Sequence, residues 1–413
     1  MDARAASGLL EKTVELAQKR GAKASECSWA HGASASFSVC DDSLERSRTS
    51  RFSAAGLRVL DGENRQGVAS LTEFDGDTAA ELCDAAFANA RGNSPEDDVI
   101  FAETSPALPD RELGVYDQAM SEWSAAEQIE LCLKMSRKAR ALDPRVCCVR
   151  SGAVHSLWGE TRTLNSFGAS CESRMTSGSL CLTLLARDGE AVEINGASNE
   201  ARSREALLAL SPVREAVSNT VRLLRGKPLR SGRFTLVLEP SVTAAFLSAL
   251  SDLFCASNVC KGLSLLAGRL GEMAASSALT LIDDGRLFAG SGTSYCDNEM
   301  IPTRKTVVLE RGRVAAWLCN LQYGRRLGFA STGNGCRGLD SLPDVDVSNF
   351  YVMPGKRSGA AIVAACGDCF QVAELMGLHT VDPVTGDFSL GARGIYHHEG
   401  ETMPVSQVTI AGN

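Results

Sequence analysis

Apolar residues recur at helical spacing near the N-terminus and predict a helix over about residues 5–20. Residues 28–52, SWAHGASASFSVCDDSLERSRTSRF, alternate in polarity and predict a pair of strands. The stretch GLRVLDGENRQGVASL at residues 56–71 predicts a hairpin whose turn lies at the Asp-Gly pair. An amphipathic helix over residues 77–93 follows, and these elements together predict a small α/β domain at residues 1–93.

The next part of the chain changes in composition and pattern. Residues 94–114 are rich in proline and acidic residues and are predicted to be a linker. A helix is predicted over about residues 124–142, followed by an antiparallel meander over residues 146–187. The turns of this meander are predicted at three glycines: Gly152, Gly159 and Gly168. A further helical stretch completes a predicted central domain at residues 115–227.

Residues 228–413 are predicted to form a C-terminal domain that opens with the strand FTLVLEP and a helix over residues 241–257. Five apolar residues of this helix are predicted to be core positions: Phe246, Leu247, Leu250, Leu253 and Phe254. Strand runs and helix runs alternate here without a βαβ rhythm. The pattern therefore predicts an α+β fold with a small N-terminal α/β domain, a central helix-plus-antiparallel meander and a larger C-terminal domain with antiparallel sheets.

Composition and charge exclude several classes of function. The 413-residue chain has a net charge of −8, so it lacks the basic excess of a nucleic-acid-binding surface, and no direct nucleic-acid partner is expected. No apolar run approaches the ~20 residues of a membrane span, so no membrane contact is expected. The N-terminus has no long apolar stretch typical of a signal peptide, and the 15 cysteines are spaced irregularly. Reduced thiols and a cytoplasmic location are therefore expected.

The histidines and one cysteine pair resemble metal or redox ligands only weakly. His397 and His398 are adjacent, so in a strand they point to opposite faces and cannot easily share one metal with each other, and their spacing from His379 matches no metal motif. The CGDC stretch places Cys366 and Cys369 at the spacing of a redox or zinc pair, but no second pair exists. Packed thiols are the expected state of both cysteines.

An acidic stretch leaves two interpretations open. Four acidic residues lie close together in the sequence: Asp283, Asp284, Asp297 and Glu299. Carboxylates in such a group can hold a hard cation, and they can equally cap helices and turns. The spacing does not match an EF-hand, so no metal ligand is assigned from the sequence.

The C-terminal half carries motifs of a known family. STGNGCR at residues 331–337, VSNFYVMPG at 347–355, DPVTGDFSLGARGIY at 382–396 and PVSQVTIAGN at 404–413 resemble the C-terminal pattern of the TldD/PmbA family of metallopeptidases. The hairpin stretch at residues 56–71 resembles the N-terminal hairpin of that family. The resemblance covers nearly the whole chain in order.

The resemblance also implies which branch of the family is present. Zinc-binding members carry HExxxH on a helix and a later cysteine ligand, whereas PmbA-like members lack the histidines. Residues 246–254 have the sequence FLSALSDLF at the corresponding place, so the chain resembles the PmbA/TldE-like branch. In two places it departs from the family pattern, since Cys296 stands where Phe is usual and Met300 where Gly is usual.

For this branch, the resemblance implies a subunit without zinc of its own, with zinc expected only in a TldD-like partner. The partner is expected to be a second copy of the chain, giving a homodimer, or a TldD-like zinc peptidase subunit. The implied function is cytosolic proteolysis or processing of unfolded or small peptides, with activity that requires the partner.

A glycine-rich loop near the C-terminus is the expected substrate-binding element. Pro383 fixes one φ angle, and Gly386 and Gly391 can supply positive φ, which indicates a shaped backbone. By resemblance, this loop borders an internal cavity. Six residues are expected to bind the substrate there: Thr385, Gly386, Asp387, Ser389, Asn334 and Arg337.

Two other functions stay open at this point. A cysteine-dependent hydrolase would use Cys336 or Cys296 as nucleophile, with His379 as its base. A regulator that binds DNA gyrase is suggested only by a label that the family also carries. No catalytic residue is assigned from the sequence.

Overall fold

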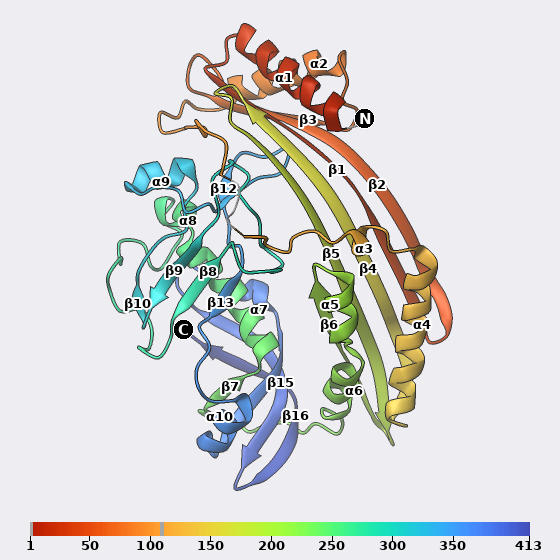
Figure 1. The fold of residues 1–413 in the computed structure, drawn as a ribbon. Coiled ribbons are helices and arrows are strands. Elements are labelled where there is room, and N and C mark those ends of the chain that lie inside the picture. The colour runs from red at the N-terminus through yellow and green to blue at the C-terminus, as the bar shows by residue number, and fades with distance from the viewer. Residues whose placement is uncertain (1–2, 108–110) are drawn as a thin grey trace.

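The computed structural model describes residues 3–107 and 111–413 (Figure 1). Its largest part is a six-stranded antiparallel sheet with the order β3-β2-β1-β4-β5-β6. The long strands bend, and the C-terminal half lies on the concave side of the sheet (Figure 1). The strands are β1 Ala24–Cys40, β2 Ser43–Leu60, β3 Gln66–Leu71, β4 Val146–Asn165, β5 Ser170–Asp188 and β6 Ala191–Ala201.

The two faces of this sheet have different partners because side chains alternate along β1. Trp29 and Phe37 point to one face, where helices cover them in two separate cores. Glu26 and Ser28 point to the other face, toward the C-terminal half. One core packs against α1 and α2, and the other against α4 and α6 (Figure 1). The helices are α1 Ala3–Lys19, α2 Thr78–Arg91, α3 Gln118–Ser121, α4 Ala125–Leu142, α5 Arg204–Leu210 and α6 Val213–Val221.

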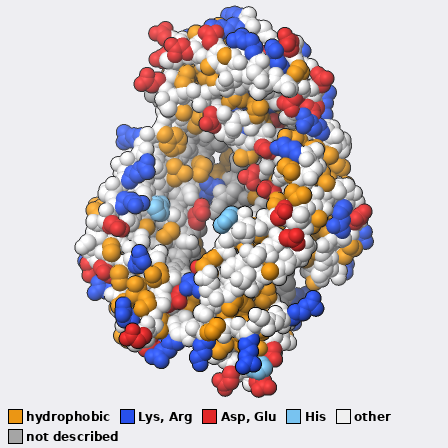
Figure 2. Space-filling model, turned by 180° about the vertical axis from the view of Figure 1, so that it is seen from behind, with side chains coloured by type: hydrophobic (Ala, Val, Ile, Leu, Met, Phe, Trp, Pro, Cys, Tyr) orange, Lys and Arg blue, Asp and Glu red, His pale blue; other side chains and the backbone are white. Residues whose placement is uncertain are grey.

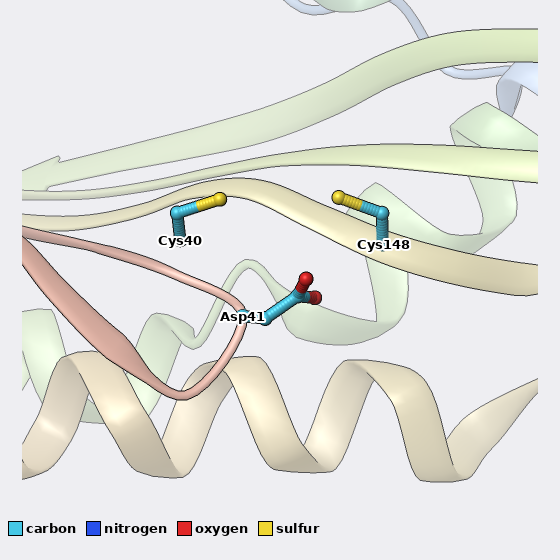
Figure 3. A group of neighbouring side chains, drawn as sticks. All are labelled: Cys40, Asp41 and Cys148. Carbon is cyan, nitrogen blue, oxygen red and sulfur yellow. The ribbon is translucent and has the colours of Figure 1, made fainter.

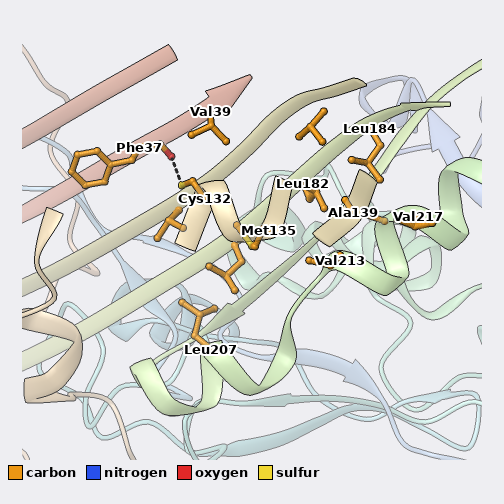
Figure 4. Close-up of a cluster of buried hydrophobic side chains, with 14 of the residues drawn as sticks. Phe37, Val39, Cys132, Met135, Ala139, Leu182, Leu184, Leu207, Val213 and Val217 are labelled. Atoms are coloured by element: carbon orange, nitrogen blue, oxygen red, sulfur yellow. Dashed lines mark hydrogen bonds between the residues drawn. The ribbon is translucent and has the colours of Figure 1, made fainter. Parts of the chain in front are cut away.

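One of these cores lies between the sheet and the helices α4 to α6 (Figure 4). Cys132 and Met135 of α4 are buried there with Leu182 and Leu184 of β5. The Cys132 thiol donates a weak hydrogen bond to the carbonyl oxygen of Phe37 at 3.5 Å. The apolar stripe of α4 therefore fixes this helix across β1, β4 and β5.

Two predicted local elements are confirmed, together with the contacts that stabilise them. The predicted central helix is α4, where Ser124 Oγ accepts from the N–H of Glu127 and the Glu127 carboxylate accepts in return, a capping box. The predicted hairpin turn joins β2 and β3. There, Asp61 Oδ1 accepts hydrogen bonds from the N–H groups of Glu63 and Arg65, both at 2.9 Å.

Two of the predicted meander turns are wrong. Gly152 and Gly159 lie inside β4, which continues through both, and only Gly168 lies in a turn, with φ of 84°. Gly159 faces Gly32 of β1 across the sheet. A Cβ on Gly32 would lie 2.2 Å from the carbonyl oxygen of Trp158, so glycine here permits close strand packing.

The predicted N-terminal and central segments contribute to one continuous sheet, because β1 pairs with β4 along most of its length. The described residues of the predicted linker form no helix or strand. Even so, Val99, Phe101 and Leu113 of this segment are buried, so it packs against the fold. The predicted domain boundaries stay predictions.

The C-terminal half contains two four-stranded sheets and a two-stranded ribbon. One sheet has the antiparallel order β10-β9-β8-β13, and the other has the order β16-β15-β14-β7, in which β7 is parallel to β14. The predicted α+β class with antiparallel sheets is confirmed. The strands are β7 Leu236–Leu238, β8 Leu281–Asp284, β9 Lys305–Glu310, β10 Arg313–Val314, β11 Gly335–Cys336, β12 Asp344–Val345, β13 Phe350–Val352, β14 Cys369–Met376, β15 Phe388–His398 and β16 Glu401–Gly412.

The helix predicted at residues 241–257 is divided into three pieces. These are α7 Pro240–Leu250, the 3-10 turn η1 Ser251–Phe254 and α8 Ala256–Cys260. The other helical elements of this half are α9 Leu321–Leu327, α10 Gly359–Cys366 and the 3-10 turn η2 Leu378–Thr380. Within residues 3–107 and 111–413, the helices are too short or too polar to cross a lipid bilayer.

Candidate functional site

An apolar pocket of about 310 Å³ lies beside α7 and the loop that precedes β15. Phe246 and Leu250 of α7 contribute to one wall, and Gly386 and Phe388 contribute from the loop side. Asn413, the last residue of the chain, also lines the pocket. Small-ligand sites are mostly apolar hollows of roughly 300–1,000 Å³ with a few polar groups, so this pocket has the character of a binding site.

The apolar residues of α7 do not all belong to the core. Leu253 and Phe254, which follow α7 in η1, are buried as predicted. Phe246, Leu247 and Leu250 are only half-buried, because they border the pocket. Leu247 and Leu250 nevertheless pack against the core of the C-terminal half, so the prediction of core positions is confirmed in part for these two residues and is wrong for Phe246. Apolar side chains that line a hollow are typical of a ligand-binding surface.

By resemblance, the zinc-binding branch of the family carries its metal ligands at residues that correspond to 246–254, and the α7 wall of the pocket does not fit this metal. Zinc in proteins is bound by cysteine sulfur, histidine nitrogen or carboxylate oxygen. The side chains that α7 contributes to the pocket, Phe246, Leu247 and Leu250, are hydrocarbons. The α7 wall of this pocket therefore offers no ligand to a zinc ion.

The glycine-rich loop forms a closed turn, as predicted. Asp382 Oδ1 accepts hydrogen bonds from the N–H groups of Val384 at 2.7 Å and Thr385 at 3.3 Å, and these bonds lower the pKa of the Asp382 carboxyl group. Gly386 has φ of 80°, and its N–H donates to the Asp382 carbonyl at 2.8 Å. The prediction that Gly391 supplies positive φ is wrong, because Gly391 lies within β15.

Asn413 connects this loop to the last strand. Its Nδ2 donates to the Thr385 carbonyl at 2.9 Å and to Asp387 Oδ1 at 2.7 Å. The side chains of Thr385, Asp387 and Ser389 are exposed. These predicted residues therefore present polar groups to solvent along the segment that contributes Gly386 and Phe388 to the pocket, and the three residues do not line the pocket themselves. No pattern in the sequence marks Asn413, since a single polar residue at the end of a strand carries no periodic signal.

Asn334 lies in the interior of the C-terminal half. Its Nδ2 donates to Asp283 Oδ2 at 2.8 Å and to the carbonyl oxygen of Asp346 at 2.9 Å. The N–H of Ser348 donates to the other Asp283 oxygen at 2.7 Å. Burial nevertheless raises the pKa of the Asp283 carboxyl group. The Asn334 amide is thus engaged within the chain and stabilises the packing of two loops.

The other acidic residues cap turns, which is the second of the two interpretations left open. Asp284 accepts a hydrogen bond from the backbone N–H two residues later at 3.0 Å. Asp297 accepts from the N–H groups of Glu299 and Ile301, each at 2.9 Å, and from Gly335 at 2.7 Å. Burial and the neighbouring Glu299 raise the pKa of Asp297 to about 7. Protein donors rather than a cation therefore surround this carboxylate.

A buried group of four charged residues joins the large sheet to the C-terminal half. Arg337 Nη2 lies 2.7 Å from a Glu26 carboxylate oxygen of β1 and donates to Ser28 Oγ at 3.0 Å. Arg58 of β2 lies 3.5 Å from Glu299. The side chains of both ion pairs are at most 3% exposed. Arg337, predicted to line the cavity, therefore fixes the C-terminal half against the sheet.

A group of three potential metal ligands lies where the turn between β1 and β2 meets β4 (Figure 3). Within the described part of the chain, only Cys40, Asp41 and Cys148 bring three such ligand atoms within 4.8 Å of one another. The Asp41 carboxylate already accepts from the N–H of Val149 at 2.9 Å and lies 3.8 Å from the guanidinium of Arg140. Both contacts compete with a cation for this oxygen, so no metal function is assigned.

The two adjacent histidines have separate partners. His397 Nε2 lies 2.9 Å from Oε1 of Gln371. His398 Nδ1 lies 3.0 Å from Oδ2 of Asp368. These separate partners, and the stacking of His398 on Tyr396 two residues earlier in β15, agree with the prediction that the two histidines point in different directions.

The cysteines named in the sequence do not form a hydrolase site. Cys366 ends α10, whereas a redox pair is activated at the beginning of a helix, and burial raises the pKa of Cys369. Burial also raises the pKa of Cys336, and Cys296 is buried against another thiol. Among the residues described, neither Cys336 nor Cys296 has a hydrogen bond to His379 or another histidine. The nucleophile–base contact of a cysteine hydrolase is therefore not formed.

Viewed from behind, the molecule is hollowed near its centre, below the N-terminal helices (Figure 2). Acidic, basic, histidine and hydrophobic side chains gather around this hollow (Figure 2). It follows from the bend of the large sheet, whose concave side faces the C-terminal half (Figure 1).

Models of one protein family match most of the chain, in three consecutive segments. Residues 26–90 match the PmbA/TldA metallopeptidase domain 1, residues 120–224 match its central domain and residues 231–413 match its C-terminal domain. The chain belongs to the PmbA/TldD metallopeptidase family. The first two matched segments contain strands of the large sheet, and the third contains α7 and the loop beside the pocket.

Named proteins and solved structures agree with this PmbA/TldD assignment. Metalloprotease PmbA of Escherichia coli O157:H7 is 26% identical over 368 residues, which is 87% of this chain and 78% of that protein. The crystal structure of TldE from Thermococcus kodakarensis has a TM-score of 0.88 at 23% identity, covering 98% of this chain and 91% of that one. A protein from Thermotoga maritima MSB8, described as a proposed modulator of a DNA gyrase, has a TM-score of 0.88 at 24% identity, covering 98% of this chain and 92% of that one. The structural matches show the shared α+β fold.

Proposed function

We propose that this member of the PmbA/TldD family is a PmbA/TldE-like subunit that binds unfolded or small peptides and has no catalytic zinc of its own. One observation carries the proposal. α7 and η1 together cover residues 246–254, where the zinc branch is expected to carry HExxxH, and α7 contributes Phe246, Leu247 and Leu250 to an apolar pocket. These side chains can bind an apolar group, and they cannot bind a metal ion.

The pocket and its loop suit a peptide. An apolar side chain of the peptide would enter the hollow between Leu250 and Phe388. The exposed polar groups of Thr385, Asp387 and Ser389 would hydrogen-bond the peptide backbone beside it. An unfolded peptide offers both an exposed apolar side chain and unpaired backbone groups, whereas a folded protein has already buried most of them.

The expected affinity is modest. Burying one apolar side chain contributes about 1.5–3 kcal/mol, and each hydrogen bond to the loop adds about 0.5–1.5 kcal/mol. Ordering a flexible peptide opposes this gain. Weak binding of many sequences is what a subunit that handles unfolded peptides requires.

Two surfaces of the C-terminal half support association with a partner chain. α10, with the sequence GAAIVAAC, has no buried residue, although all its side chains are apolar or absent. Exposed apolar patches of this kind often mark protein interfaces. β16, 12 residues long, lies at the edge of its sheet, and edge strands are commonly paired or covered. The partner would be a second copy of this chain or a TldD-like zinc peptidase subunit.

The partner role is tested by mixing the chain with a family subunit that carries HExxxH. Light scattering of the chain alone is expected to give the mass of a dimer, with no hydrolysis of an unfolded fluorogenic peptide. The mixture is expected to hydrolyse the peptide faster than the zinc subunit alone, and a metal chelator is expected to stop it. Chelator-sensitive hydrolysis by the chain alone would exclude the zinc-free assignment. A mixture no faster than the zinc subunit alone would exclude the partner role.

A further inference from the structure

Two thiols from distant parts of the chain meet where the large sheet contacts the C-terminal half. Cys171 lies at the start of β5, and Cys296 lies in the loop between β8 and β9. Their Sγ atoms are 2.7 Å apart. A disulfide bond needs about 2.05 Å between the sulfurs, so only a small side-chain movement separates this contact from a covalent bond.

The two thiols differ in access. Cys171 lines a hollow of about 220 Å³ that Ser7 and Arg162 also border. Cys296 is only 7% exposed, whereas Cys171 is half-buried and packs against the buried Ala169 and Met300. A small oxidant can therefore reach Cys171 first, whereas Cys296 stays shielded behind it.

The two thiols also differ in pKa. The two sulfurs share a hydrogen bond in which either can be the donor, and this bond lowers the pKa of Cys171 despite its partial burial. The same bond and burial raise the pKa of Cys296. The nearby carboxylates of Asp297 and Glu172 raise the pKa of Cys171 again to a smaller extent. The accessible sulfur is thus the better nucleophile, and the shielded sulfur keeps its proton.

We infer that Cys171 and Cys296 are a peroxide-reactive thiol pair, with Cys171 as the attacking cysteine and Cys296 as the resolving cysteine. A reachable thiolate beside a second thiol is the arrangement of redox-sensor cysteines. In the first step, the Cys171 thiolate attacks one oxygen of hydrogen peroxide, the O–O bond breaks, hydroxide leaves and Cys171 becomes a sulfenic acid. In the second step, Cys296 sulfur attacks Cys171 sulfur, the S–O bond breaks, and the hydroxyl leaves as water with the Cys296 proton. Peroxide is reduced by two electrons, and the two sulfurs are oxidised by one electron each.

The resulting bond would join β5 to the loop that carries Asp297 and Glu299. This loop already contacts the sheet through the buried pair of Glu299 and Arg58. A disulfide would make the contact covalent and restrict separation of the two halves. A dithiol reductant would reverse it.

The experiment treats the purified full-length chain with hydrogen peroxide and counts free thiols under denaturing conditions. The wild-type chain is expected to lose two of its 15 thiols, and peptide mapping is expected to find Cys171 joined to Cys296. The variants Cys171→Ser and Cys296→Ser are expected to lose this cross-link. The matched control Cys181→Ser, another half-buried cysteine of β5, is expected to retain it.

A second measurement distinguishes the roles of the two sulfurs. In Cys296→Ser, the sulfenic acid on Cys171 has no resolving thiol, so dimedone is expected to label Cys171 within minutes of peroxide addition. In Cys171→Ser, no label on Cys296 is expected. Wild-type protein that keeps all its thiols under peroxide, or joins a different pair, would overturn the inference. Dimedone labelling of Cys296 in Cys171→Ser would overturn the assigned roles.

Discussion

Replacing Arg337 with methionine is expected to lower the free energy of unfolding by about 3–5 kcal/mol. The guanidinium lies 2.7 Å from Glu26, and both side chains are at most 3% exposed. Methionine keeps much of the side-chain volume but leaves the Glu26 carboxylate buried without its ionic partner. The cost arises mainly from this unpaired charge and is measured by urea denaturation at neutral pH.

Two comparisons separate this effect from a general loss of an arginine. The double variant Glu26→Gln, Arg337→Met is expected to recover a large part of the loss, because the buried charge is also removed. Arg269→Met breaks an exposed pair with Glu272, whose side chains are 38% and 60% exposed, and is expected to cost less than about 1 kcal/mol. Equal losses for Arg337→Met and Arg269→Met would show that the buried pair does not stabilise the contact between sheet and C-terminal half.

The second large effect is expected from Asp297 and depends on pH. Burial and Glu299 raise the pKa of Asp297 to about 7 in the folded state, against about 3.9 in an unfolded chain. The folded state therefore holds this proton more tightly. The stabilisation from the protonated form is fully present below pH ~3.9 and is lost as pH rises through 7. Since one pKa unit corresponds to about 1.36 kcal/mol, the loss is about 4 kcal/mol.

Asp297→Asn removes the titration and is expected to remove this pH dependence. The amide group of the variant places an N–H donor against the N–H donor of Gly335. This unfavourable contact lowers the free energy of unfolding of the variant by the same amount at every pH. The stability of wild type relative to Asp297→Asn, from urea denaturation across this pH range, is expected to fall as pH rises. Asp75→Asn serves as a control of opposite sign, because backbone N–H donors lower the pKa of Asp75. If the difference in free energy of unfolding between wild type and Asp297→Asn does not change with pH, the assigned pKa is contradicted.

Local patterns were sufficient for several elements of this fold. The Asp-Gly pair after β2 predicts the hairpin turn, since Asp61 accepts the turn N–H groups with its own carboxylate. The turn of the glycine-rich loop was also predictable, because Pro383 restricts its own φ angle and Gly386 can adopt a positive φ angle. Such features depend on neighbours in sequence, so the sequence alone describes them.

Features that depend on contacts between distant segments were not predictable in the same way. Gly159 predicts a turn when only its neighbours in sequence are considered. In the structure it lies within a continuous strand and pairs with Gly32 across the sheet. Glu26 and Arg58 have the pattern of solvent-facing strand residues, but the C-terminal half covers them. Leu250 has the pattern of a core residue, because apolar periodicity does not distinguish a core from a pocket.

Peptide binding by wild type and Leu250→Glu tests the central claim most directly. Fluorescence anisotropy would follow a labelled unfolded peptide rich in leucine and phenylalanine, with Leu208→Glu, an exposed leucine of α5, as the matched control. Losing one apolar contact of about 1.5–3 kcal/mol predicts a roughly 10–100-fold rise in Kd for Leu250→Glu. Leu208→Glu is expected to bind as wild type does. Equal affinity of Leu250→Glu and wild type, or no binding by wild type, would contradict a peptide-binding role for the pocket beside α7.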